Sequence, residues 1–166
     1  DVWAPDGDPI PISTWPELPP ETGGICLFEG PLRDLAPGLK QVPIQAVLTA
    51  LPRPNQAFWT LSALWSGWLW GREAVTPFKM VLRRRRYDWH WHASAMQAAL
   101  KNLAPVLPLQ APLFAIIAEP EPSYISAAVL AASSAGFDLN GVALRTPHDP
   151  AYLLWHRRAF THQPTA

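Results

Sequence analysis

Along the chain, segments in which apolar residues are consecutive alternate with segments in which they recur every three or four residues. The first pattern predicts buried strands and the second predicts helices. Three largely apolar runs, 25–28, 44–49 and 113–118, have the length of buried strands, and most of their ends are marked by glycine or proline. Such runs are typical of parallel strands that helices cover on both faces. Residues 137–145 and 151–157 are two further strand candidates, and the short loop between them fits an antiparallel hairpin.

Helical spacing predicts two long helices and two shorter ones. From Asn55 onward, one stripe recurs at steps of three and four and predicts a helix packed on a sheet through Phe58, Leu61, Leu64, Trp65, Trp68 and Leu69. Gly71 is expected to end this helix. Asp88 is a candidate cap for the second long helix, whose stripe is Trp89, His92, Met96, Ala99, Leu100 and Leu103. Residues 124–135 predict an alanine-rich helix that ends before Gly136, and residues 32–39 predict one or two turns of helix.

The first 22 residues differ from the rest because they carry six prolines: Pro5, Pro9, Pro11, Pro16, Pro19 and Pro20. Each proline removes a hydrogen-bond donor and restricts the residue before it, which favours an extended arm over residues 1–22. Trp3, Ile10, Ile12 and Trp15 are expected to pin the arm to the body, and a polyproline ligand for another domain is the alternative. Residues 23–166 then form one domain with an α/β order of elements.

Composition limits the classes of function. The 166 residues are 49% hydrophobic and 16% charged, which excludes a disordered, highly charged tail. The formal net charge is zero, so attraction to nucleic acid or anionic lipid would have to be local. The apolar run 57–70 is shorter than the roughly 20 residues that span a bilayer, so no membrane role is expected.

The single cysteine, Cys26, cannot form an internal disulfide, and its apolar neighbours predict a buried strand thiol. A reducing, cytoplasmic compartment fits this composition best. The chain starts at Asp1 rather than Met and shows no charged and apolar leader, so we expect that it was cut from a longer protein.

The segment from Ala46 to Trp59 is the most informative, because an apolar strand runs into a proline-stiffened loop and then into an aromatic helix. With this segment, the chain resembles the later half of a Rossmann-like, S-adenosylmethionine-dependent methyltransferase that acts on amino groups of DNA. The resemblance covers about 130 residues by order of elements; its pieces are 24–35, 45–59, 102–118 and 123–157, the last with Ala135-Gly136-Phe137. It implies a three-layer α/β domain whose short, mostly parallel sheet ends in an antiparallel hairpin.

The resemblance also implies where the active site would lie. In that family an Asp, Asn or Ser accepts hydrogen bonds from the target amine, prolines hold a carbonyl on it, and an aromatic ring stacks on the flipped base. In this chain the acid position is Ala50, the first proline is Leu51, Pro52 is retained, and Arg53 stands at the aromatic position. The substrate surface would then comprise Pro52, Arg53, Asn55, Phe58 and Trp59.

The cofactor signature of the family is absent as well. No glycine-rich turn of the G-x-G type follows a strand, so S-adenosylmethionine lacks its usual backbone cradle and no cofactor is expected. The chain is then either a degenerate domain kept for binding or assembly, or the back half of a nucleic acid adenine or cytosine amino-methyltransferase completed by a missing cofactor half. The first interpretation is favoured, because truncation does not explain Ala50.

A plain interaction or dimerisation domain is the third hypothesis. Trp59 and Trp70 fall off the predicted stripe of the aromatic helix, so if they are exposed we expect a protein partner or a second copy to cover them.

Three other groups are weighed for chemistry. Arg83, Arg84, Arg85 and Arg86, followed by Tyr87, Trp89 and Trp91, combine cations with stacking rings, which indicates nucleic acid contact or, more simply, a solvated turn. His90 and His92 would hold zinc on a strand but point apart on a helix, so no metal is expected. Glu119 and Glu121 follow the strongest predicted strand. They are either a catalytic acid/base pair or, with the prolines beside them, only the residues that end the strand.

Overall fold

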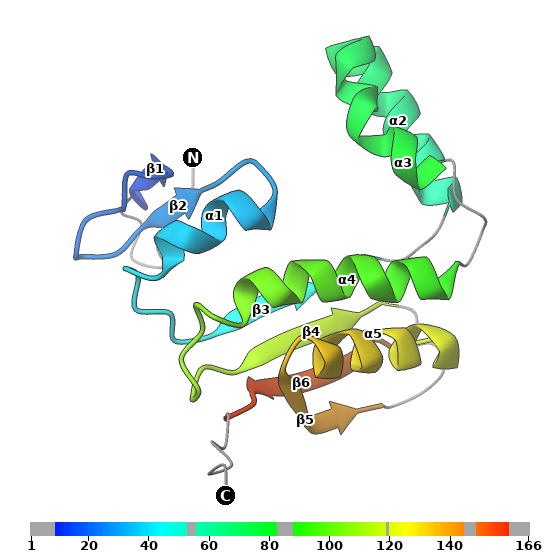
Figure 1. Cartoon of the computed structure of the whole chain (residues 1–166). Coiled ribbons are helices and arrows are strands. Elements are labelled where there is room, and N and C mark those ends of the chain that lie inside the picture. The colour runs from blue at the N-terminus through cyan, green and yellow to red at the C-terminus, as the bar shows by residue number, and fades with distance from the viewer. Residues whose placement is uncertain (1–8, 53–55, 83–87, 119, 145–148, 160–166) are drawn as a thin grey trace, which may run out of the picture. The chain divides into compact units, whose positions relative to one another are not determined.

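The computed structural model describes residues 9–52, 56–82, 88–118, 120–144 and 149–159, with the backbone alone at 56–58, 80 and 81. By compactness the chain divides into two units, Asp1–Pro43 and Ile44–Ala166 (Figure 1). The boundary expected from the prolines, at residue 22, does not coincide with this division.

The first unit contains two short strands and one helix. Strand β1 (Ile12–Thr14) pairs in parallel with β2 (Ile25–Leu27), and α1 (Leu32–Leu39) follows. Residues 12–14 of the expected arm are thus strand residues, and the backbone N–H of Trp15 donates to the Leu27 carbonyl at 2.8 Å. Cys26 lies in β2 as predicted, although its side chain is half-buried rather than buried.

The second unit is built on a four-stranded sheet in the order β3-β4-β6-β5. Its strands are β3 (Val47–Ala50), β4 (Leu113–Ile117), β5 (Phe137–Ala143) and β6 (Ala151–Arg157). Strands β3 and β4 are parallel, whereas β6 is antiparallel to both β4 and β5. The predicted hairpin 137–157 is confirmed, but among the described strands of this sheet the parallel pairing is confined to one pair.

Helices α4 (Trp89–Leu103) and α5 (Pro122–Ser134) pack side by side over one face of this sheet (Figure 1). Four alanines of α5 are buried, namely Ala127, Ala128, Ala131 and Ala132, and their small side chains let the helix approach its neighbours closely. The sheet contributes Leu113, Ile117, Leu153 and Trp155 to the same core. Gly136, at a φ of 93°, ends the α5 segment as expected.

The opposite face of the sheet carries exposed apolar side chains. Leu48 is 80% exposed, and Phe114, Ile116 and Tyr152 are 41%, 42% and 45% exposed. The described residues of this unit therefore form two layers, and the three-layer arrangement expected from the sequence is not seen in them. An apolar run predicts a strand correctly, but it does not prove that both of the strand's faces are covered.

Helix α2 (Gln56–Trp70) is followed by the 3-10 helix η1 (Arg72–Phe78) and by α3 (Lys79–Leu82), and these three elements pack on one another. Trp59 contacts Phe78 with ring centroids 6.0 Å apart, Ala63 is buried, and a Cβ at Gly67 would meet Val75. Gly71, at a φ of 86°, ends α2 as predicted. None of the described helices is both long and apolar enough to cross a bilayer.

The predicted buried stripe of α2 is wrong. Its described members are all more than half exposed: Leu61 56%, Leu64 66%, Trp65 51%, Trp68 76% and Leu69 58%. The side facing η1 instead carries Trp59 and Ala63. The helix contains no charged residue, so its apolar side chains surround it, and helical spacing alone cannot select the buried side.

Candidate functional site

The loop after β3 lies at the carboxyl end of the parallel pair β3–β4. The backbone N–H of Leu51 donates to the Ile116 carbonyl at 3.0 Å, which extends the pairing of the two strands by one residue. Ala50 and Pro52 are exposed, and Leu51 is half-buried. The position at which the family resemblance expects an acid therefore presents a methyl group, which accepts no hydrogen bond.

Tyr124, in the first turn of α5, is bound to this loop. Its hydroxyl donates to the Leu51 carbonyl at 2.6 Å, and the residue is only 1% exposed. A hydrogen bond of this length constrains the loop, because breaking it would leave the buried Tyr124 hydroxyl poorly solvated. The carbonyl at the position of the motif's first proline is thus engaged by the protein itself.

Two aromatic rings from α4 surround Tyr124. The ring of Trp89 stacks on it at 5.7 Å and 27°, and the His92 ring meets it edge-on at 5.5 Å and 65°. Asp88 orients this end of α4, because its Oδ1 accepts the backbone N–H of Trp91 at 2.9 Å. We call Trp89, His92 and Tyr124 the aromatic cluster.

His92 is the polar member of the aromatic cluster. It is 4% exposed, and its Nε2 is buried without a hydrogen-bond partner among the described residues. Burial lowers the pKa of this imidazole below its ordinary value of 6.5, because the charged form loses solvation. The ring is therefore neutral at neutral pH, and it packs as an aromatic side chain.

The two histidines of the His-x-His pair lie on different sides of α4. His90 is exposed while His92 is buried, so the two rings point apart as predicted for a helix. No group of three or more potential metal ligands occurs within the part of the chain that the structure describes.

The remaining predicted site residues are placed as follows. The Trp59 ring contacts Phe78 of η1, and Phe58 belongs to α2. Glu121 is the half-buried residue immediately before α5. Six predicted site residues (Arg53, Asn55, Arg83, Arg84, Arg85 and Arg86), together with Glu119 of the weighed acid pair, lie outside the described residues.

Tyr124 and Trp89 are the residues that reasoning from sequence missed at this site. Only their positions in the sequence could have indicated this site. Both residues lie in the first turns of helices, and Tyr124 follows the strongest strand at the edge where open α/β sheets bind ligands. Their mutual stacking, and the bond to Leu51 from 73 residues away, had no sequence signature.

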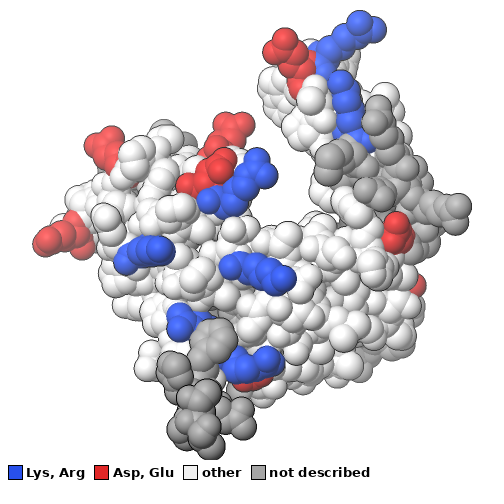
Figure 2. Space-filling model, in the orientation of Figure 1, with Lys and Arg blue, Asp and Glu red and all other residues white. Residues whose placement is uncertain are grey.

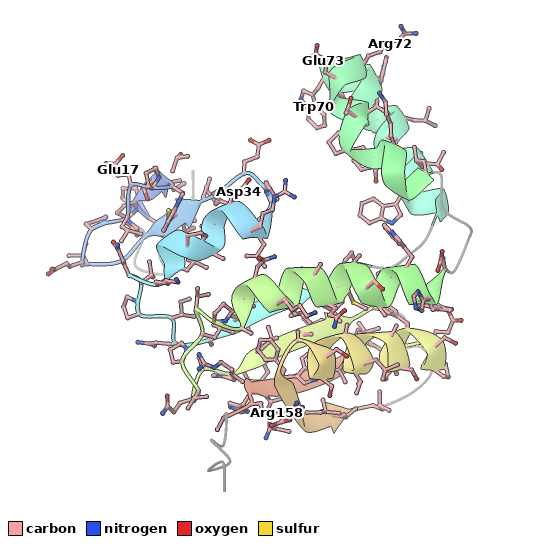
Figure 3. All side chains as sticks on the ribbon, in the orientation of Figure 1. Glu17, Asp34, Trp70, Arg72, Glu73 and Arg158 are labelled. Carbon is pink, nitrogen blue, oxygen red and sulfur yellow. The ribbon has the colours of Figure 1, made fainter. Side chains whose placement is uncertain are left out.

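The second notable feature is the exposed side of α2. Five residues along one side of the helix, which we call the α2 apolar surface, are each more than half exposed: Leu61, Leu64, Trp65, Trp68 and Leu69. Trp70, which is 73% exposed, lies off this side at the end of the helix. Trp65 and Trp68 contact each other with ring centroids 5.3 Å apart. Figure 3 labels Trp70, Arg72 and Glu73 at the far end of the segment made by α2, η1 and α3, and Figure 2 shows charged atoms at that end.

No protein-family model matches the chain, and a search of curated proteins found no match.

Proposed function

We propose that this chain is a methyltransferase-like, non-catalytic module of the cytoplasm that assembles with a protein partner through the α2 apolar surface. The observation that carries the proposal is the exposure of this surface, where Trp68 and Leu64 are 76% and 66% exposed on a helix without charged residues. Contiguous apolar patches of this kind mark binding surfaces on soluble proteins. Large aromatic side chains also contribute most to the free energy of binding at interfaces.

The loop after β3 supports the absence of catalysis. Ala50 provides no acceptor for an amine, and the Leu51 carbonyl already accepts the Tyr124 hydroxyl. Among the described residues, the ring contacts of His92 are with Trp89 and Tyr124, and the Tyr124 hydroxyl is already bound to the Leu51 carbonyl. With no G-x-G turn in the sequence, we expect no bound S-adenosylmethionine.

A second candidate is the back half of a nucleic acid amino-methyltransferase whose cofactor half is supplied by another chain. The observation in its favour is the place of Leu51 and Pro52 at the carboxyl end of the parallel strands β3 and β4, where α/β sheets bind ligands. In that case Arg83 to Arg86 would contact nucleic acid, and the cofactor would be S-adenosylmethionine.

Calorimetric titration with S-adenosylmethionine tests our candidate, because saturable binding at up to millimolar ligand would overturn it. We expect no heat of binding, a result that the second candidate shares when its cofactor half is absent, so the two candidates are separated by binding of nucleic acid. Titration with single-stranded DNA at low salt gives the matching measurement for nucleic acid, because phosphate contacts weaken steeply as salt is raised.

Assembly through α2 is tested by a photo-reactive amino acid placed in the full chain at position 68 and, as a matched control, at position 130. Leu130 lies on α5 and is 64% exposed, so both positions are accessible while only one belongs to the α2 apolar surface. We expect a discrete protein adduct from position 68 and none from position 130, and the reverse result would refute the proposal.

A further inference from the structure

Asn140 is the extra residue of a β-bulge in the hairpin of β5 and β6. Leu139 lies opposite Trp155, and the next pair in the register is Gly141 opposite Leu154, so the register passes over Asn140. Asn140 is exposed, and β5 is at the edge of the four-stranded sheet. Because a bulge locally disrupts the ladder, Asn140 lies at an exposed and irregular point of the hairpin.

Gly141, the residue after Asn140, is not required there by the backbone or by a described neighbour. A bulge calls for glycine where φ is positive, and Gly141 is not among the glycines with positive φ. A Cβ at Gly141 would lie 3.6 Å from the Leu154 Cβ, which is ordinary van der Waals contact. What glycine does provide is a backbone nitrogen that no side chain of its own residue shields.

An asparagine followed by glycine can lose ammonia without an enzyme, and asparagine is among the thermally labile residues. The backbone nitrogen of the glycine attacks the asparagine Cγ and gives up its proton. A C–N bond forms, the Cγ–Nδ2 bond breaks, and ammonia leaves. Water then opens the cyclic imide at either carbonyl, which gives aspartate or isoaspartate, so the reaction consumes water and releases ammonia.

His156 is placed to assist this reaction at Asn140. Its Nδ1 donates to the Asn140 Oδ1 at 3.0 Å, because an amide oxygen only accepts hydrogen bonds. Oδ1 gains negative charge while the Gly141 nitrogen adds to Cγ, and a donor held on that atom stabilises the charge. The same bond limits the rotation of the amide, so it also orients the carbon that is attacked.

We propose that Asn140 is a site of spontaneous deamidation in the folded chain, with the Gly141 nitrogen as nucleophile and His156 as the assisting donor. Either product places a new negative charge beside His156, and isoaspartate also adds a carbon atom to the main chain of β5. This modification is independent of the proposed assembly through α2.

Peptide mass spectrometry of the full chain, incubated folded at neutral and at mildly alkaline pH, measures the reaction. We expect Asn140 to convert with time, and faster at the higher pH, because the attacking nitrogen must lose its proton. Asn102 is the control within the same chain. Its Nδ2 donates to the Ala98 carbonyl at 2.8 Å in α4, and the next residue is the buried Leu103, so Asn102 should remain intact.

Two results of this incubation would overturn the proposal. An Asn140 that stays intact in the folded chain refutes the site, and its conversion in urea would then show that the fold protects it. Equal conversion of Asn102 and Asn140 refutes the role of the bulge.

Gly141→Ala tests the nucleophile, because the added methyl group fits beside Leu154 yet shields the backbone nitrogen. Circular dichroism should show the wild-type fold, and the rate of conversion at Asn140 should fall by at least about tenfold, since the nitrogen reaches Cγ less freely. An unchanged rate refutes attack by the residue at position 141.

His156→Phe removes the donor from the Asn140 Oδ1 and should also slow the reaction. Conversion that is as fast as in the wild type, or faster, refutes the assistance by His156.

Discussion

At the scale of single residues, Tyr124 connects elements that are remote in sequence. Its hydroxyl binds the Leu51 carbonyl, and its ring lies against Trp89 and His92. One side chain thus joins the loop after β3 to the starts of α4 and α5.

The bond from Tyr124 is testable by Tyr124→Phe, which keeps the ring and removes the hydroxyl. We expect the free energy of unfolding in urea to fall by about 1 kcal/mol, the usual net value of such a bond. Tyr152→Phe, on the exposed face of the sheet, should change it much less, because Tyr152 is 45% exposed. Equal losses in the two variants would contradict the role assigned to the bond.

The buried imidazole of His92 should make the free energy of unfolding depend on pH. Its pKa in the folded chain is lowered by burial, so the unfolded chain binds its proton more readily. The contribution of neutral His92 to stability is complete above the unfolded pKa of about 6.5 and is lost progressively as the pH falls from that value toward the lowered pKa of the folded chain. Urea unfolding between pH 5 and 8 should therefore show stability rising with pH.

The variant His92→Phe should flatten this pH dependence, because the substituted ring has no proton to gain. His90→Gln is its matched control on the exposed side of the same helix, and it should preserve the slope. An unchanged slope in His92→Phe would show that other groups cause the dependence.

At the scale of elements, helix ends are defined by individual residues. The start of α4 depends on Asp88, whose side chain accepts the Trp91 N–H, and the ends of α2 and α5 depend on Gly71 and Gly136 at positive φ. Because the first turn of α4 carries Trp89 and His92, its cap also orients the aromatic cluster.

Removing the cap by Asp88→Ala should lower the free energy of unfolding by about 1 kcal/mol, whereas Asp88→Asn should retain most of it. Thermal unfolding followed by circular dichroism measures both variants. Near-ultraviolet signals of Trp89 and Tyr124 should weaken in the alanine variant alone. If alanine and asparagine behave alike, the side-chain bond is not what starts the helix.

At the scale of the whole molecule, apolar burial is distributed unevenly. In the described part of unit 1–43, Ala36 is the buried apolar residue, whereas the core of unit 44–166 includes Leu113, Ile117 and Trp155. Small units that bury little surface are marginally stable, so we expect the first unit to open more readily.

Hydrogen exchange measures this difference. Amides of Ile12–Thr14 and Ile25–Leu27 should exchange much faster than those of Leu113–Ile117 and Ala151–Arg157, although both sets lie in paired strands. Comparable protection in the two sets would mean that the first unit is stabilised by contacts beyond its own core.

The pattern of residues by itself determined most of the elements. The strands at 25–27 and 113–117, the hairpin, the cap at Asp88 and the glycine ends follow from spacing and backbone chemistry, which are local. The side of α2 that is buried, the open face of the sheet and the bond from Tyr124 to Leu51 were decided by tertiary structure. Those features depend on which distant surfaces meet, and a helix without charged residues or a strand of apolar residues contains no local signal that selects its partner.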